Sequence, residues 1–196
     1  MTVFLIILVA YLIGSIPFGL VGVFFFKIQD PRSFGSKNIG ATNVLRSGNK
    51  KAAAFTLFFD MFKGFVAVFI SSYIDSDLIY LAILSVVFGH IFPIYLLFKG
   101  GKGVATFLGA LLSYSAVVGG LTLFTWLTVF YFTRKSSVAG ISAIVLSNFF
   151  LFLFCDNISV KVSALLLSIF ILFKHSANIK RLLKKEELSF EGRDKN

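Results

Sequence analysis

The chain has 196 residues, of which 57% are hydrophobic and only 14% are charged. Soluble domains carry about 25% charged residues, so this composition excludes an ordinary soluble domain and indicates an all-α, polytopic membrane protein with one domain, residues 1–196. The formal net charge of +10 would suggest nucleic acid as a partner of a soluble protein, but here basic loops on one face of a bilayer explain it, and no nucleic-acid partner is expected. The single cysteine, Cys155, excludes an internal disulfide and a cysteine-based metal cluster.

The first predicted span covers about residues 3–26 and contains no charged residue. Pro17 lacks a backbone donor, which predicts a kink near the middle of this span. The N-terminus has no basic region before its apolar run, so we expect a retained span and not a cleaved signal peptide. A basic, polar loop follows at 27–51, and two more spans are predicted at about 52–73 and 78–98.

The uncharged stretch 104–133 is long for one span of about 20 residues and short for two. The Gly119-Gly120 pair near its middle predicts a turn between two short spans. Two further spans are predicted at about 137–155 and 158–174.

The distribution of charge decides the number of spans. If 104–133 forms two spans, there are seven in all, and the basic loops and the tail 174–196 lie on one side of the membrane. These segments hold all but two of the 19 lysines and arginines, the exceptions being Lys63 and Lys161. By the positive-inside rule, this predicts seven transmembrane helices with the N-terminus outside and the C-terminus in the cytoplasm.

The loop FKGGKGVAT, residues 98–106, has a composition suited to anions. Its glycines permit backbone N–H groups to form an anion-binding nest, and Lys99 and Lys102 add positive charge. A helix is predicted to begin at Val104, and its N-terminus would favour an anion. The pattern differs from a Walker A loop, since Leu96 stands where that motif requires glycine. A phosphate site is one interpretation; a tight loop whose lysines only set the membrane topology is the other.

Two more polar motifs fall on the same predicted side of the membrane. The first, FGSKNIGATNVLR at 34–46, is rich in glycine, hydroxyl and amide groups and includes Arg46, although turn residues of a solvated loop give a similar pattern. The second, KHSANIKRLLKKEE at 174–187, places His175 and Asn178 on one helical face. A basic stop signal beside the membrane would account for its lysines and arginines but not for these two residues.

Asp60 and Lys63 lie three residues apart inside an apolar span, where each charge needs a partner or a function. Mutual pairing is the simplest interpretation. Support of the glycine-rich loops from behind is a second hypothesis, and a proton relay is a third. His90, about two helical turns before the glycine loop, is interpreted as structural.

Five stretches together resemble one family in order and over nearly the whole chain. They are GSIPFG (14–19), GSKNIGATNVLR (35–46), DMFKG (60–64), GHIFPIYLLFKGGKGVAT (89–106) and HSANIKRLL (175–183). They resemble the bacterial acyl-phosphate:glycerol-3-phosphate acyltransferases, small enzymes of the bacterial cell membrane. Two departures are Lys37, where the family usually has glycine, and the tail sequence KKEE, which leaves the role of Glu186 open.

The resemblance implies seven transmembrane helices with the active site at the cytoplasmic face. It implies transfer of a fatty acyl group from acyl phosphate to the 1-hydroxyl of glycerol 3-phosphate, which gives lysophosphatidic acid in phospholipid biosynthesis without acyl-CoA as donor. The expected partners are these two substrates and membrane lipid. No cofactor, metal or obligate protein partner is implied.

The resemblance also assigns roles to individual residues. The catalytic group would comprise His175, Asn178 and Ser36. The substrate or phosphate site would comprise Ser36, Asn38, Asn43, Arg46, Gly100, Gly101, Lys102, Gly103, Thr106 and Asn178. The hydroxyl proton would pass either to His175 or to a substrate phosphate.

Two other classes of function use the same sequence features. A membrane transporter or binder of an organic phosphate anion would need the same basic loops. A purely structural membrane protein is a weaker alternative, because it leaves the glycine loop unexplained.

Overall fold

The computed structural model describes residues 1–188, and the end of the predicted basic tail, 189–196, lies outside them. The described part contains ten α-helices, three short 3-10 helices and no strand, which confirms the predicted all-α class. The α-helices are α1 (Thr2–Ser15), α2 (Phe18–Phe26), α3 (Ala41–Leu45), α4 (Lys50–Ile74), α5 (Ile79–Ile91), α6 (Val104–Tyr114), α7 (Ala116–Thr133), α8 (Ser136–Phe154), α9 (Ile158–Lys174) and α10 (Ser176–Leu183). The 3-10 helices are η1 (Pro31–Ser33), η2 (Ser76–Leu78) and η3 (Ile94–Leu96).

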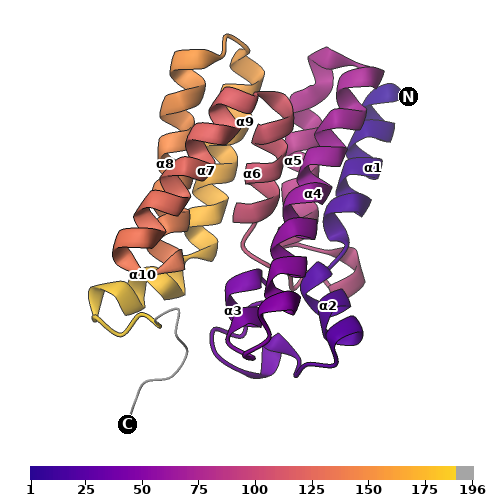
Figure 1. Cartoon of the computed structure of the whole chain (residues 1–196). Helices are drawn as coiled ribbons and strands as arrows, with labels where there is room; N and C mark the ends of the chain where they lie inside the picture. The colour runs from indigo at the N-terminus through magenta and orange to yellow at the C-terminus, as the bar shows by residue number, and fades with distance from the viewer. Residues whose placement is uncertain (189–196) are drawn as a thin grey trace.

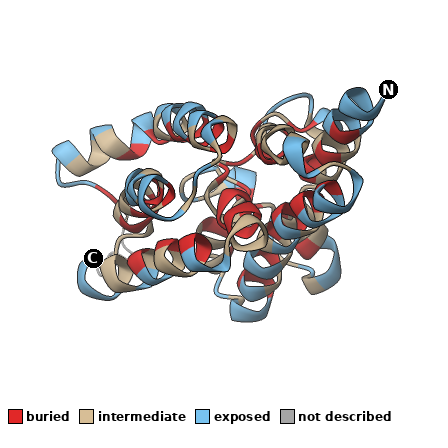
Figure 2. Cartoon of the chain, turned by 90° about the horizontal axis from the view of Figure 1, so that it is seen from above, coloured by how far each residue is buried: buried red, intermediate tan, exposed pale blue. Residues whose placement is uncertain are grey.

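The long helices form a bundle, and the short helices gather at one end of it. Figure 1 shows α2, α3 and α10 at the lower end and the N-terminus at the upper end. The most extensive contacts between helices are those of α4 with α6, α1 with α5, and α7 with α8. Figure 2 shows buried residues on the sides of the helices that face the interior and exposed ones on the outer sides. Many of these exposed residues are large and apolar, among them Phe24, Phe69, Phe124 and Phe152, which suits a surface that contacts lipid.

Five helical segments of the described chain are long and apolar enough to cross a membrane. They are Thr2–Phe26, Lys50–Ile74, Ser76–Leu96, Ala116–Thr133 and Ser136–Phe154. The pair α9 and α10, bent by 58°, makes a sixth if it is counted as one span. At 11 residues, α6 is shorter than the roughly 20 residues that a full span needs.

The first predicted span is broken at Pro17, as its sequence predicts. α1 ends at Ser15 and α2 begins at Phe18, with Pro17 as the residue before its first turn. Proline cannot donate the helical hydrogen bond, so the helix ends and restarts here.

The uncharged stretch 104–133 does form two helices, but the prediction that they meet at Gly119-Gly120 is wrong. The break lies at Ser115, whose backbone is extended and whose hydroxyl accepts a hydrogen bond from the N–H of Val118 at 3.4 Å. Gly119 lies inside α7, where a Cβ atom would come within 2.5 Å of the Cα of Leu112. The glycine therefore permits close packing of α6 against α7, and the serine supplies the helix cap.

α4 and α6 approach each other even more closely, and this contact positions the start of α6. A Cβ atom on Gly64 would lie 2.0 Å from the carbonyl oxygen of Thr106, and one on Gly109 would lie 1.9 Å from that of Met61. Any side chain at either glycine would separate the two helices. The N-terminal part of α6 is thus held against the middle of α4, which carries Asp60 and Lys63.

Candidate active site

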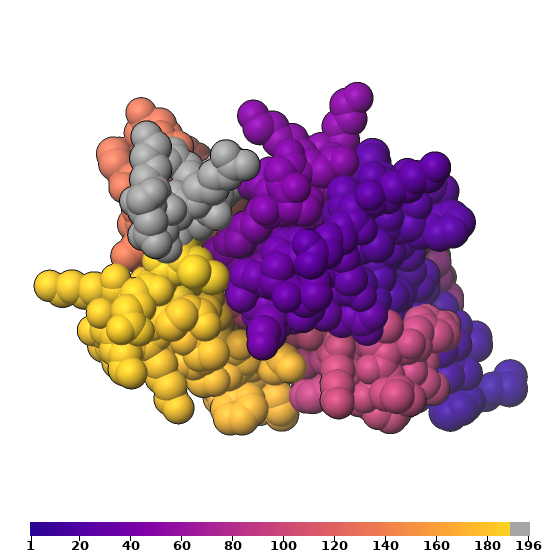
Figure 3. Space-filling model, turned by 90° about the horizontal axis from the view of Figure 1, so that it is seen from below, coloured from indigo at the N-terminus to yellow at the C-terminus, as the bar shows by residue number. Residues whose placement is uncertain are grey.

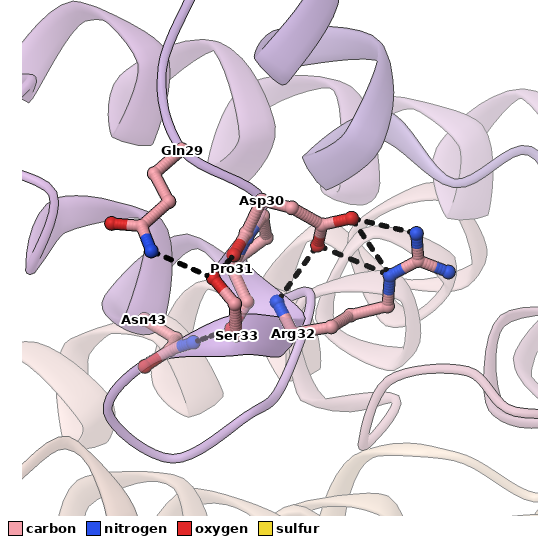
Figure 4. A network of polar contacts seen from close by, with 6 residues as sticks. All are labelled: Gln29, Asp30, Pro31, Arg32, Ser33 and Asn43. Carbon is pink, nitrogen blue, oxygen red and sulfur yellow. Dashed lines mark hydrogen bonds and ion pairs between the residues drawn. The ribbon is translucent and has the colours of Figure 1, made fainter.

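The first polar loop begins with a compact, exposed turn. Asp30 precedes η1 and accepts a hydrogen bond from the N–H of Arg32 at 2.8 Å, and its carboxylate pairs with the guanidinium of Arg32 at 2.6 Å (Figure 4). Hydrogen bonding to Arg32 lowers the pKa of Asp30. Because the two side chains are 38% and 53% exposed, such a pair contributes at most about 1 kcal/mol. The turn shapes the start of the loop, and neither side chain lines the cavity described below.

Asn43 is the centre of this loop. Its side-chain oxygen accepts hydrogen bonds from the backbone N–H of Ser36 at 2.9 Å and from the guanidinium of Arg46 at 3.3 Å. Its side-chain nitrogen donates to the carbonyl groups of Pro31, Phe34 and Asn38; the first of these residues lies beside it in Figure 4. The Asn43 amide is buried, and both its oxygen and its nitrogen form hydrogen bonds within the loop. It therefore holds Ser36 and Arg46 next to each other.

The backbone on either side of Ser36 is left-handed. Gly35 and Lys37 have the same φ of 56°. Glycine adopts this conformation at no steric cost, whereas lysine does so at a cost of about 1 kcal/mol. Lys37 therefore has a backbone conformation that suits glycine, the residue usual at this position in the family that the sequence resembles. The Lys37 side chain is exposed.

The glycine loop turns back onto the end of α5. The N–H groups of Gly100 and Gly101 donate to the carbonyl oxygens of Ile91 and His90 at 3.2 and 3.0 Å. These two donors are therefore used within the protein, which does not support the expected nest of consecutive free N–H groups. Gly103, with φ of 92°, is the residue before α6, so the helix begins at Val104 as predicted.

Lys102 extends from this loop towards the C-terminal motif. Its ammonium group donates a hydrogen bond to the side-chain oxygen of Asn178 on α10. Burial lowers the pKa of Lys102 to about 8, against the opposing effect of Glu187, and the cations Arg181 and Arg46 act in the same direction as burial. A lysine close to other cations and only partly balanced by a carboxylate is suited to bind a further anion.

His175 lies at the bend between α9 and α10, directly before the helix that carries Asn178. Its Nδ1 lies 2.7 Å from the carbonyl oxygen of Ile171, so Nδ1 carries the proton and donates it, which leaves the Nε2 lone pair free. Burial and the nearby charge of Lys102 lower the pKa of His175 to about 4. The imidazole is therefore neutral at physiological pH.

Glu187 is a site residue that the sequence analysis missed. The carboxylate accepts a hydrogen bond from the side chain of Asn178 at 2.6 Å and pairs with Arg181 at 2.9 Å. Despite its burial, hydrogen bonds from its neighbours lower the pKa of Glu187. Its neighbour Glu186 is exposed. The pair of acids at the end of an otherwise basic motif was the sequence feature that could have indicated this residue. The sequence did not indicate which of the two glutamates turns inward.

The three motifs meet at one cavity of about 180 Å³. Figure 3 shows the end of the bundle at which the indigo-to-violet first loop, the pink segment near the glycine loop and the yellow C-terminal segment come together. The predicted site residues that line the cavity are Ser36, Asn38, Asn43, Arg46, Lys102, Gly103, His175 and Asn178, joined by Glu187. Its apolar wall comes from α4, α6 and α7 and comprises Leu57, Val104, Leu108, Leu123, Trp126 and Leu127.

Three predicted site residues do not line this cavity. Gly100 and Gly101 pack against the end of α5, where their N–H groups are already bonded. Thr106 is fully buried in α6, with its carbonyl oxygen against Gly64 of α4. These positions shape the backbone on which Lys102 and Gly103 are carried.

Asp60, Lys63 and His90 form a buried polar cluster that reaches the cavity through Asp60 and His90. Lys63 pairs with Asp60 at 2.8 Å, which confirms the expected mutual pairing. The His90 Nδ1 lies 3.5 Å from the same carboxylate. Among residues 1–188, no three His, Cys, Asp or Glu side chains lie together as a metal site would require.

The fold and site thus define a helical membrane protein with a cavity in which Arg46 and Lys102 lie beside an apolar wall. The glycerol-3-phosphate acyltransferase family model matches residues 4–185. Glycerol-3-phosphate acyltransferases of Paraburkholderia phymatum and Bartonella quintana are 45% and 42% identical to this chain, over 91% and 97% of it and 88% and 93% of their own lengths. The chain belongs to the glycerol-3-phosphate acyltransferase family.

A solved structure supports the same assignment. The crystal structure of PlsY (YgiH), an integral membrane glycerol 3-phosphate acyltransferase, in its glycerol 3-phosphate form, is similar to this chain with a TM-score of 0.91. The two are 37% identical, and the match covers 96% of each chain.

Proposed function

We propose that this protein transfers a fatty acyl group from acyl phosphate to the 1-hydroxyl of glycerol 3-phosphate. The products are lysophosphatidic acid and phosphate, in the first acylation step of phospholipid synthesis. The observation that carries the proposal is the convergence of the three polar motifs on one cavity with an apolar wall. A polar end for phosphate groups next to an apolar wall for an alkyl chain matches the two halves of these substrates.

Arg46 and Lys102 hold the substrate phosphate groups in this proposal, with Ser36 and Asn178 orienting them. The buried Nε of Arg46 has no hydrogen-bond partner in the described part of the chain, so this donor remains available for a ligand. Each charge-assisted hydrogen bond to phosphate contributes about 1.5–3 kcal/mol. A few such contacts give useful affinity for a small dianion.

The reaction needs no covalent enzyme intermediate. The glycerol hydroxyl oxygen attacks the acyl carbonyl carbon, the bond from that carbon to the phosphate oxygen breaks, and phosphate leaves. The N–H groups at the start of α6, next to Gly103, are placed to stabilise negative charge on the acyl oxygen.

The proton of the hydroxyl passes to a base in the same step. His175 offers its Nε2 lone pair, but a pKa of about 4 makes it a weak base. A phosphate group, whose second pKa is about 6, is stronger. We therefore favour a substrate phosphate as the acceptor, with the proton leaving on the released phosphate ion.

The membrane arrangement belongs to the same proposal. The short α6 serves as a fourth span, which gives seven, with the N-terminus outside and the C-terminus in the cytoplasm. The basic loops and the cavity then share the cytoplasmic face of the bacterial cell membrane. The gathering of α2, α3 and α10 at one end of the bundle supports this arrangement (Figure 1).

The direct test is to incubate the purified protein with palmitoyl phosphate and glycerol 3-phosphate, without added metal, and to measure lysophosphatidate. Absence of product, or product only with acyl-CoA, contradicts the proposal. The same protein in vesicles separates the alternative function. A carrier of organic phosphate would move labelled glycerol 3-phosphate across the membrane and form no lysophosphatidate.

A further inference from the structure

The proposed chemistry leaves the buried cluster Asp60, Lys63 and His90 without a use. Their exposed fractions are 3%, 3% and 5%. Burying an ion pair among apolar helices costs several kcal/mol per ion, and pairing alone recovers that cost only in part. A cluster of this kind, with Asp60 and His90 in the cavity lining, therefore calls for a function other than mutual neutralisation.

Lys63 connects the cluster to the break in the first span. Its ammonium group lies 2.8 Å from Asp60 and also donates to the carbonyl oxygen of Ile16 at 2.8 Å. Ile16 lies between the end of α1 and the start of α2, next to Pro17. α4 is thus fastened to the first span where that span is interrupted.

His90 connects the cluster to the glycine loop. On one side, its Nδ1 faces the Asp60 carboxylate. On the other side, its ring lies directly against Gly101, since a Cβ atom on Gly101 would come within 2.0 Å of Nε2. The carbonyl oxygen of His90 also accepts the N–H of Gly101 at 3.0 Å. Both the ring and the backbone of His90 therefore fix the path of the loop one residue before Lys102.

We infer that Asp60, Lys63 and His90 are positioning residues for the anion site. The cluster acts through the glycine loop: Asp60 orients the His90 ring, the ring fixes Gly101, and Lys102 is thereby held beside Asn178. The carboxylate of Asp60 pairs with Lys63 at 2.8 Å and faces the His90 Nδ1 at 3.5 Å, and its negative charge would repel a phosphate dianion. The kinetic test of this inference rests on the proposed function. The contact between the His90 ring and Gly101 does not depend on that function.

Gly101 and His90 offer a reciprocal test. The three atoms nearest to a Cβ atom on Gly101 all belong to the His90 ring. We expect Gly101→Ala to displace the loop, and His90→Ala to leave it unsupported. In the double variant, the new methyl group occupies space that the ring has vacated. We therefore expect the double variant to recover at least about tenfold in kcat/KM over Gly101→Ala alone.

Gly100→Ala is the matched control. A Cβ atom there would meet the backbone carbonyl oxygen of His90 at 2.2 Å and Pro93 at 2.3 Å, which His90→Ala does not remove. We expect no recovery in that double variant. Recovery of both glycine variants, or of neither, overturns the inference.

A second measurement separates positioning from general stability. We expect Asp60→Asn and His90→Ala each to raise the KM for one of the two phosphate substrates about tenfold. Gly101→Ala is expected to raise the KM for that same substrate. Ser71→Ala, which changes another buried polar residue of α4 far from the loop, is expected to leave both KM values unchanged. A loss of thermal stability without this common change in KM contradicts the inference.

The two proposals fail in distinguishable ways. If wild-type protein makes no lysophosphatidate, the proposed function is wrong. The thermal midpoint then tests the contact independently: Gly101→Ala is expected to lower the midpoint, and His90→Ala to restore part of it. Additive losses in that measurement overturn the positioning contact whatever the activity.

Discussion

Lys102 predicts a pH dependence that can be worked out from the structure. Burial lowers its pKa to about 8, so the ammonium form is present below that value and is lost as the pH rises through it. About nine-tenths of the side chain is charged at pH 7 and about one-tenth at pH 9. If the charge is needed to bind phosphate, kcat/KM of the wild-type enzyme falls about tenfold per pH unit above pH 8.

The assay is lysophosphatidate formation from palmitoyl phosphate between about pH 6 and about pH 9.5, corrected for hydrolysis without enzyme. Lys102→Arg keeps the charge at all these pH values. We therefore expect this variant to lose the alkaline decrease, whatever its absolute rate. Lys102→Ala removes a contact of about 1.5–3 kcal/mol, which lowers kcat/KM by about 10- to 150-fold or more. A flat wild-type profile up to pH 9.5, or the same decrease in Lys102→Arg, would refute the reasoning.

Three further predictions concern other residues of the cavity. Arg46→Ala is expected to lower kcat/KM by at least about tenfold while the protein stays monodisperse in detergent; near-normal activity removes Arg46 from the phosphate site. His175→Gln is expected to lower kcat by less than about 100-fold, because a base of pKa about 4 supplies little catalysis, and a larger decrease at an unchanged KM restores His175 as the base. Glu187→Gln places an amide donor against the donors of Asn178 and Arg181, so we expect kcat/KM to fall about tenfold or more. Glu186→Gln changes the exposed neighbour and is expected to leave kcat/KM unchanged.

Several elements of the fold follow from local rules. An uncharged run predicts a membrane helix, a proline inside it predicts the break at Pro17, and the change from glycine loop to apolar residues places the start of α6 at Val104. Each of these outcomes depends on the backbone of one segment alone. The break between α6 and α7 does not, because Gly119 serves helix packing and Ser115 serves as the cap. The sequence alone does not separate these two uses of a small residue.

The candidate site was predictable at the level of motifs and less so at the level of atoms. The distribution of charge predicted that the three motifs lie on one side of the membrane, and their described residues meet at one cavity. Composition did not reveal that the N–H groups of Gly100 and Gly101 are consumed by α5. Nor did it reveal the inward turn of Glu187, which depends on the chain folding back after α10 through Lys185 with φ of 60°.

The central claim is that acyl phosphate is the direct acyl donor. The most direct measurement supplies the purified protein with palmitoyl phosphate and radiolabelled glycerol 3-phosphate. It then measures the lysophosphatidate formed and the inorganic phosphate released in the same reaction. We predict one phosphate released for each lysophosphatidate formed, with no acceleration by acyl-CoA. Phosphate release without acylated glycerol 3-phosphate, or acylation that requires acyl-CoA, would contradict the account.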